Sequence, residues 1–210
     1  MRTRLVVVRH GETEWNLASR IQGHADSPLT PAGEAQAAAI AGRLARERFD
    51  RLVSSDLGRA LRTAQAIAAR TGHAIEADAR FRERSYGVAE GLTYGEIGVH
   101  YPEVFSRVRD TDPDYVVPGG ESRRQLFERI RDAFESLARG AGGGRIAVVC
   151  HGGVLAALYR HVHGIPVGAS QAIPIPNASY NALVFEAGRW EVEAWADTAH
   201  LSATAPFVEP

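Results

Sequence analysis

Hydrophobic residues in this chain occur in two patterns, short continuous runs and longer stretches with helical spacing. Residues 5–8 and 146–150 are the clearest continuous runs, and both are rich in β-branched residues. Apolar runs of this length predict buried strands. Each run leads directly into a polar segment that contains a histidine and a glycine. The sequence therefore predicts two buried strands with polar chemistry at their carboxyl ends.

Further strands are predicted by shorter patterns. Residues 51–55 form a second short strand, and residues 74–77 form a weak one. Residues 180–186 and 190–195 alternate between apolar and polar positions around a glycine-containing turn. This alternation predicts a β-hairpin that extends the sheet.

Helical spacing appears between these strands. Thr30 is the expected cap of a helix over residues 31–48. The next helix is expected to begin with Asp56 or Ser55 as its cap and to end at Gly72. Its expected inner face consists of Leu57, Leu61, Ala64, Ile67 and Ala68.

The second half of the chain contains further helices. A capping box of Ser122 and Gln125 predicts the start of a long amphipathic helix that ends at Gly140. A similar box at residues 93–96 predicts a short helix, and residues 154–163 form a helix after the 146–150 strand. Alternating strands and helices indicate the α/β class.

Length and charge limit the possible partners. With 210 residues the chain suits one domain, although the length would also allow two smaller domains. There are 24 basic and 25 acidic residues, for a formal net charge of −1. Because the whole chain has almost no net charge, it is not expected to attract nucleic acid or an anionic membrane. Any site for an anion must therefore be formed by a small group of neighbouring basic residues.

The cellular compartment is also predicted from composition. Cys150 is the single cysteine, which excludes an intrachain disulfide. The first apolar run is too short for a signal peptide, and no run approaches the length needed to span a membrane. We therefore expect a soluble cytoplasmic protein.

Candidate catalytic residues lie at the ends of the two clearest strands. Arg9 and His10 follow the strand at residues 5–8, and His151 follows the strand at residues 146–150. In an open α/β sheet, ligands bind at the carboxyl ends of the strands. A strand can also end in charged residues simply because it reaches water, so these positions alone do not establish a site.

Two more charged residues strengthen the functional interpretation. Arg59 is predicted in the first turn of the helix after residues 51–55, where the helix dipole gives an arginine no stabilisation. We therefore expect Arg59 to contribute little to folding. Glu83 lies in an irregular polar segment, residues 81–91. Four histidines are expected to be solvated: His24, His73, His100 and His200.

One acid facing several cationic groups suits a phosphoryl substrate. Guanidinium groups form charge-assisted, bidentate hydrogen bonds with phosphate oxygens. A histidine nitrogen can attack phosphorus, and a carboxylic acid can protonate the leaving oxygen. The sequence provides all three kinds of group, provided that the segments converge.

The chain resembles the histidine phosphatase superfamily, also called the cofactor-dependent phosphoglycerate mutase-like family. The matching stretches occur in the family's order and span most of the chain. They are residues 9–16, residues 54–60 with Thr63 and Ala64, Glu83 with Gly87, Glu90 and Gly91, and residues 151–153.

The resemblance implies a role for each matched residue. His10 would be the phosphorylated nucleophile and Glu83 the proton donor and acceptor, while Arg9, Arg59 and His151 would hold the phosphate. Further phosphate or substrate contacts would come from Asn16, Gln22, Gly23 and Gly152. The resemblance also implies a three-layer α/β/α sandwich around a mostly parallel sheet with an antiparallel edge, with no metal and no organic cofactor for hydrolysis. Residues 85–120 would form a lid-like insertion in a single domain of residues 1–210.

Two enzyme activities remain open. A phosphoglycerate mutase of the isomerase type would use 2,3-bisphosphoglycerate and would need extra cations over the pocket. Between residues 103 and 114 the chain has two arginines, Arg107 and Arg109, but four carboxylates, so this segment has no excess of positive charge. The paired arginines Arg123 and Arg124 fall on a helix instead of in an insertion over the pocket. Hydrolysis of a small phosphorylated metabolite by water is therefore favoured over the mutase reaction.

A non-catalytic phosphate-binding or regulatory protein is the alternative of another class. Binding alone needs neither a nucleophile nor an acid, so the presence of both His10 and Glu83 favours an enzyme.

The physiological substrate and the oligomeric state stay open, with a homodimer as one option. Residues 17–28 and 85–120 are expected to select the substrate.

Overall fold

The fold is built on one six-stranded sheet, described here from a computed structural model of residues 1–109 and 112–202. The strand order is β3-β2-β4-β1-β5-β6. The four strands from β3 to β1 are parallel, and β5 and β6 add an antiparallel edge. The strands are β1 (Arg2–Arg9), β2 (Arg51–Ser54), β3 (Ile75–Ala77), β4 (Arg145–Cys150), β5 (Tyr180–Glu186) and β6 (Arg189–Asp197).

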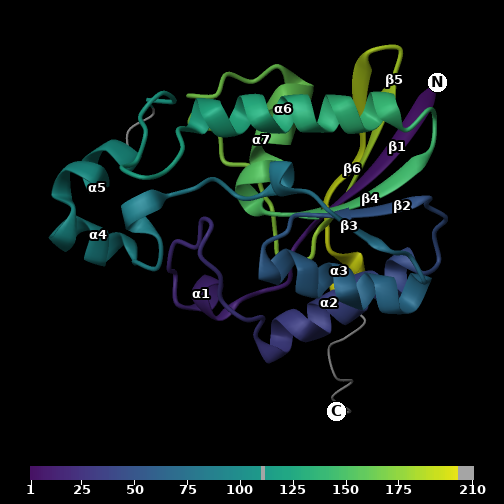
Figure 1. Cartoon of the computed structure of the whole chain (residues 1–210), viewed down its shortest axis with the longest axis horizontal. Coiled ribbons are helices and arrows are strands. Elements are labelled where there is room, and N and C mark those ends of the chain that lie inside the picture. The colour runs from purple at the N-terminus through teal and green to yellow at the C-terminus, as the bar shows by residue number, and fades with distance from the viewer. Residues whose placement is uncertain (110–111, 203–210) are drawn as a thin grey trace.

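Helices cover both faces of the sheet (Figure 1), which confirms the predicted three-layer sandwich. Helices α6 and α7 pack on one face, and α2 and α3 pack on the other. The α-helices are α1 (Glu14–Leu17), α2 (Pro31–Leu44), α3 (Gly58–Thr71), α4 (Tyr94–His100), α5 (Pro102–Arg109), α6 (Arg123–Gly140), α7 (Gly152–His163) and α8 (Ala199–Ser202). Two 3₁₀ turns, η1 (Ala79–Phe81) and η2 (Gly87–Ala89), lie between β3 and α4.

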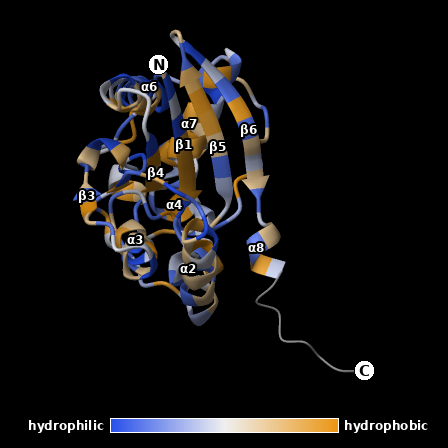
Figure 2. Ribbon diagram, turned by 90° about the vertical axis from the view of Figure 1, so that its right-hand side faces the viewer, coloured by the Kyte–Doolittle hydropathy of each residue, from blue (hydrophilic) through white to orange (hydrophobic). Residues whose placement is uncertain are grey.

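The continuous apolar run of β1 is explained by burial on both faces. Leu5 and Val7 point to the side of α6 and α7, whereas Val6 and Val8 point to the side of α2 and α3. Figure 2 shows the hydrophobic colour concentrated in the strands between the helical layers. This burial fixes the sheet register, so the residues that follow the strands have defined positions.

Segment 85–120 forms a small cluster of its own at some distance from the sheet (Figure 1). Its buried residues are Ala89, Ile97, Val104, Val108 and Val117. The predicted capping box at residues 93–96 is present at the start of α4, and Pro102 begins α5. The prolines, glycines and aspartates of residues 110–120 predict a surface connection, of which residues 110–111 lie outside the described residues.

Several local predictions were wrong. Helix α2 ends at Leu44 rather than at residue 48, because residues 46 and 47 continue in tighter turns. The short helix α1 was not predicted, although Thr13 and Asn16 form a capping box for it. His73 and His200 are half-buried instead of solvated, since their Nε2 atoms lie 2.8 and 3.0 Å from backbone carbonyls.

The start of α3 also differs from the prediction. Its N-cap is Leu57, which makes no side-chain cap hydrogen bond. Ser55 and Asp56 are used elsewhere: Ser55 contacts His151, and Asp56 pairs with Arg82. The buried face is rotated from the prediction, so that Leu61 and Ala68 are only half-buried. The fully buried positions on α3 are Arg59, Ala60, Thr63, Ala64 and Ile67.

Candidate active site

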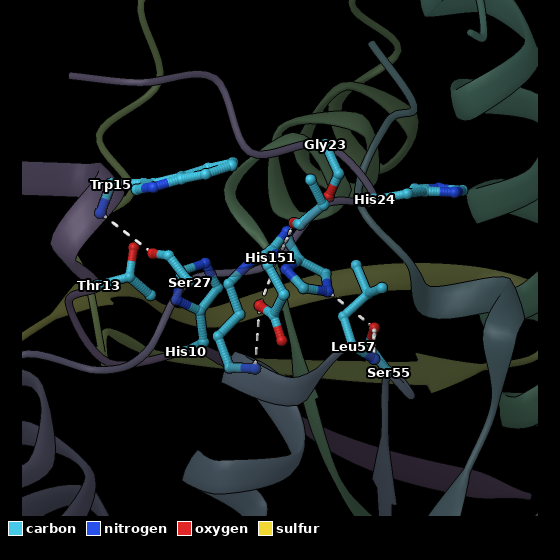
Figure 3. Close-up of polar contacts among 12 residues, drawn as sticks. His10, Thr13, Trp15, Gly23, His24, Ser27, Ser55, Leu57 and His151 are labelled. Atoms are coloured by element: carbon cyan, nitrogen blue, oxygen red, sulfur yellow. Dashed lines mark hydrogen bonds and ion pairs between the residues drawn. The ribbon is translucent and has the colours of Figure 1, made fainter. Parts of the chain in front are cut away.

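The strand register brings His10 and His151 together. Arg9 in β1 is paired with Cys150 in β4, so each histidine follows directly after one member of a parallel pair. The His10 backbone N–H donates to the Cys150 carbonyl oxygen at 3.0 Å, and the two imidazole centroids are 5.2 Å apart. Figure 3 shows the His151 ring beside Ser55, which follows the neighbouring strand β2.

His10 is held with one ring nitrogen free to react. Its Nδ1 lies 2.7 Å from the Gly11 carbonyl oxygen, and a carbonyl can only accept a hydrogen bond. Nδ1 therefore carries the proton, which leaves a lone pair on Nε2. The His10 carbonyl accepts from Asn177 Nδ2 at 3.0 Å and from the Ala178 backbone N–H at 3.2 Å, which fixes the backbone of the loop.

Both histidines are neutral in the folded protein. Burial lowers the pKa of His10 well below its usual value, and the positive charges of Arg59 and Arg9 lower it further. Burial likewise lowers the pKa of His151, again with a contribution from Arg59. A neutral His10 has the lone pair that a nucleophile needs.

We expect the neutral burial of these histidines to make stability depend on pH. The unfolded chain binds protons on them at about pH 6.5, whereas the folded protein binds them only at lower pH. Their contribution to the free energy of unfolding is therefore complete above pH ~6.5 and decreases below it by about 1.4 kcal/mol per pH unit for each histidine. Calorimetry should show Tm falling below pH ~6.5, less steeply in His10→Gln. An equal slope in that variant would contradict a neutral His10.

Two arginines lie beside the histidines, and each has a buried nitrogen that lacks a hydrogen-bond partner among the described residues. Arg9 Nη1 donates to the Ile175 carbonyl at 2.6 Å, while Arg59 Nη2 donates to the Gly23 carbonyl at 2.8 Å. Arg59 Nη1 also donates to the Asp26 carboxylate at 3.0 Å. The buried Nε atoms of Arg9 and Arg59 have no hydrogen-bond partner among the described residues. An anion in this pocket would provide one.

Glu83 is positioned by two backbone donors. Its Oε2 accepts from Gly153 N–H and its Oε1 from Arg84 N–H, both at 2.8 Å. A Cβ on residue 153 would lie 2.1 Å from Glu83 Oε1, so a side chain there would displace the Glu83 carboxylate. His24 Nε2 lies 2.9 Å from the Glu83 carbonyl oxygen and is half-buried, so the prediction of a solvated His24 was wrong.

Close backbone packing supports the loop after β1. A Cβ on Gly33 would lie 1.9 Å from the Glu12 carbonyl oxygen, and one on Gly11 would lie 2.5 Å from the Gly33 carbonyl oxygen. Thr63 Oγ1 accepts from the Gly11 N–H at 3.1 Å. From the sequence alone, Gly33 would only weaken its helix. No local signal indicates that the absence of a side chain at Gly33 leaves room for the loop after β1.

The predicted substrate contacts lie at a cavity of about 550 Å³. Asn16, Gln22 and Gly23 line it, and Gln22 Oε1 is buried without a partner among the residues described. Gly152 and His151 are not among its lining residues: Gly152 stands beside Arg9, and His151 is fully buried. The full set of lining residues is Arg9, His10, Trp15, Asn16, Ser19, Arg20, Ile21, Gln22, Gly23, Arg59, Glu83, Tyr86 and Tyr94.

The outer wall of this cavity comes from the segments that the sequence analysis expects to select the substrate, residues 17–28 and 85–120. Ile21 lies in the first of these segments, and Tyr86 and Tyr94 lie in the second. Arg20 also lines the wall, but its guanidinium forms a bidentate pair with the Glu96 carboxylate at 2.7 and 3.1 Å. Backbone hydrogen bonds at Thr93 and the Arg20 guanidinium lower the pKa of Glu96 to about 2.

The described residues contain no group of three His, Cys, Asp or Glu side chains that could hold a metal ion. Within the same part of the chain, no helix combines the length and apolar character needed to cross a bilayer.

Comparison with known proteins gives a consistent result. A family model described as histidine phosphatase superfamily (branch 1) matches residues 5–198. The chain is 42% identical over 205 residues to a metal-independent phosphoserine phosphatase from Arabidopsis thaliana, covering 96% of this chain and 84% of that protein. It is 36% identical to a probable phosphoglycerate mutase GpmB from Serratia proteamaculans, covering 95% of each. The solved structure of mycobacterial glucosyl-3-phosphoglycerate phosphatase superposes with a TM-score of 0.81 at 33% identity, covering 93% of this chain and 99% of that one.

Proposed function

The chain belongs to the histidine phosphatase superfamily, and from this premise we propose that it hydrolyses phosphomonoesters through a phosphorylated His10. The observation that carries this proposal is the state of His10: neutral, with its Nε2 lone pair free, beside two arginines with unpaired buried Nε atoms. Glu83 lines the same cavity, where it can reach a leaving oxygen.

The reaction has two steps in this geometry. First His10 Nε2 forms a bond to phosphorus, the bond from phosphorus to the ester oxygen breaks, and Glu83 gives that oxygen its proton. Then Glu83, now ionised, accepts a proton from water as the water oxygen attacks the phosphohistidine and frees His10. The N–H groups of Gly153 and Arg84 stabilise the ionised carboxylate between the steps.

We propose that Ser55 sets the tautomer of His151. Ser55 Oγ accepts from the Leu57 N–H at 3.3 Å and lies 2.8 Å from His151 Nε2, and we assign its hydroxyl as a donor to that nitrogen. The proton of the neutral ring then resides on Nδ1, which is buried without a partner in the described part of the chain. We assign this N–H to a phosphate oxygen. Ser55 is a positioning residue that sequence reasoning took for a helix cap.

Hydrolysis is favoured over the mutase reaction by the charges around the cavity. Arg107 pairs with Asp112, and Arg124 pairs with Asp114, so neither adds a free positive charge. Arg20 reaches the cavity but is neutralised by Glu96. A second phosphate of a bisphosphate would therefore find little compensation in the 550 Å³ cavity.

A screen of phosphomonoesters tests the proposed function. It should measure phosphate release and, separately, the interconversion of 2- and 3-phosphoglycerate with and without 2,3-bisphosphoglycerate. We expect phosphate release without bisphosphate. Interconversion that exceeds release would instead support the mutase alternative, and tight binding without either reaction would support the non-catalytic alternative.

Arg59→Ala should impair both catalysis and folding. The guanidinium contributes to the transition state, so we expect a loss of about 2–4 kcal/mol in kcat/KM. The sequence alone favours little effect on folding, but Arg59 is only 2% exposed and bonds the loop of residues 23–26, so the structure leads us to expect one. Its removal should cost about 1–3 kcal/mol in the free energy of unfolding. Urea titration and steady-state kinetics measure the two effects, with the exposed Arg62→Ala as control. Lost stability with unchanged kcat/KM would make Arg59 purely structural.

Several broader assignments accompany this proposal. We propose that the reaction needs no metal or organic cofactor, an assignment supported by the relative named as metal-independent. The substrate is a small phosphorylated metabolite, as in the phosphatases to which the chain is similar. A single domain with segment 85–120 as a lid, and a cytoplasmic location, stay predictions from the sequence.

A further inference from the structure

The backbone of His10 is held by the turn of residues 176–179, directly before β5. Asn177 Nδ2 donates to the His10 carbonyl oxygen at 3.0 Å, and the Ala178 N–H donates to the same oxygen at 3.2 Å. Asn177 Nδ2 also lies 3.3 Å from Oδ1 of Asn16, which lines the catalytic cavity. The position of His10 therefore depends on the conformation of this turn.

Ala178 has a backbone conformation that needs support. Its φ is +52°, in the left-handed region, which is unfavourable for a residue with a Cβ. Its side chain is fully buried, and both of its backbone polar groups are bonded. The N–H donates to His10, and the carbonyl oxygen lies 3.0 Å from Nε2 of His200. A strained conformation of this kind persists only where the surrounding contacts hold it.

His200, in α8, is present in the tautomer that this contact requires. Arg43 Nη1, from α2, lies 3.3 Å from His200 Nδ1. A guanidinium can only donate, so Nδ1 is the acceptor and the proton of the neutral ring lies on Nε2. Burial lowers the pKa of His200, which favours the neutral ring. The Nε2–H group therefore donates to the Ala178 carbonyl oxygen.

The side chain that orients His200 is itself fixed. Arg43 Nη2 donates to the Asp197 carboxylate at 2.7 Å, and the guanidinium carbon lies 3.7 Å from the centroid of the Tyr180 ring. Asp197 ends β6 and Tyr180 begins β5, so both contacts connect α2 to the sheet. A chain of hydrogen bonds thus runs from this anchored arginine through His200 to the turn.

We propose that His200 is a positioning residue for the nucleophile, because its hydrogen bond to Ala178 keeps the turn in the conformation that holds His10 for attack. His200 is not among the residues that line the catalytic cavity, so it acts through the turn and not on the substrate. The proposal rests on the proposed function, because it assumes that His10 is the nucleophile.

Two substitutions of His200 test this role. His200→Leu removes the donor, whereas His200→Gln keeps an amide N–H near the position of Nε2. Rapid mixing with protein in excess over p-nitrophenyl phosphate measures the single-turnover rate of phosphorylation, and calorimetry measures the Kd of inorganic phosphate. We expect His200→Leu to lower the rate about tenfold or more while the Kd changes less than about threefold, because a small displacement of the attacking atom affects the reaction more than binding. His200→Gln should retain most of the rate.

His73→Leu is the matched control. His73 is also half-buried, and its Nε2 lies 2.8 Å from a backbone carbonyl oxygen, that of Phe49, before β2. The two leucine variants remove the same kind of hydrogen bond, so a general loss of stability would affect both. We expect Tm to fall in both variants. The single-turnover rate, measured well below either Tm, should fall only in His200→Leu.

Nuclear magnetic resonance observes His10 without any turnover. In protein that carries isotope-labelled histidine, the ring signals of His10 are assigned by their loss in His10→Ala. These signals should shift in His200→Leu and keep their wild-type positions in His73→Leu, because only His200 bonds the turn that contacts His10.

A rate in His200→Leu no lower than in His73→Leu would overturn the proposal, as would His10 signals that stay unchanged. Equal losses in His200→Leu and His200→Gln would also overturn it, because the donated hydrogen bond would then have no role. Failure of the proposed function is distinguishable, since the wild-type protein would release no nitrophenolate. The resonance measurement would still report whether His200 positions His10.

Discussion

His10→Ala is expected to abolish turnover, with a loss of more than about 10⁴-fold in kcat, as for other nucleophile deletions. In the wild-type protein, His10 Nε2 should become covalently phosphorylated during the reaction. Substrate carrying labelled phosphorus should therefore label the protein with the properties of a phosphoramidate, labile in acid and stable in base. The variant should show no label, because no other residue replaces the Nε2 lone pair.

His100→Ala is the matched control, since His100 is an exposed histidine outside the cavity. It should keep both turnover and labelling. Undiminished turnover in His10→Ala would disprove the mechanism as a whole, and labelling that persists in that variant would assign the nucleophile to another residue.

Glu83→Gln should separate the two halves of the reaction. The variant cannot exchange a proton, so alkyl phosphates, whose leaving oxygen needs one, should lose most of their phosphorylation rate. The leaving group of p-nitrophenyl phosphate is stable as an anion, so its first step should be less affected. The second step lacks its base with either substrate. Rapid mixing should therefore show a burst of nitrophenolate followed by slow turnover.

The surroundings of Glu83 sharpen this expectation. Both carboxylate oxygens accept from backbone N–H groups, of Gly153 and Arg84. The amide of Glu83→Gln has one NH₂ group, which would face one of these donors and lose its hydrogen bond. Glu83→Asp, which retains the acid on a shorter side chain, is the useful comparison. An equal loss of burst rate for both substrate types would point to another proton donor.

The fold could be predicted from the sequence to a large extent, because burial dictates the pattern of apolar and polar residues along the chain. Residues 5–8 are buried on both faces and therefore read as a continuous apolar run. The start of α6 could be predicted from its capping box, a purely local signal. The buried face of α3 could not, because it includes Arg59 and Thr63, polar residues whose partners lie in distant loops.

The candidate site could be predicted only where residues follow strands. General rules for parallel sheets place both histidines at the same edge of the sheet. They do not specify that β1 pairs with β4, the pairing that makes His10 and His151 adjacent. The roles of Ser55 and Gly33 depend instead on contacts between distant segments. Neither has a sequence pattern that distinguishes it from an ordinary helix cap or a helix-weakening glycine.

The central position of β1 affects how the protein is made. β1 leaves the ribosome well before its two neighbours in the sheet, β4 and β5, which lie much further along the chain. Long-range pairing of this kind delays folding and leaves an apolar strand exposed in the nascent chain. The His10 carbonyl acquires its Asn177 and Ala178 partners only after those later residues have been made. His10 is thus synthesised well before the residues that position it, so a chain terminated before β4 and β5 has no assembled site.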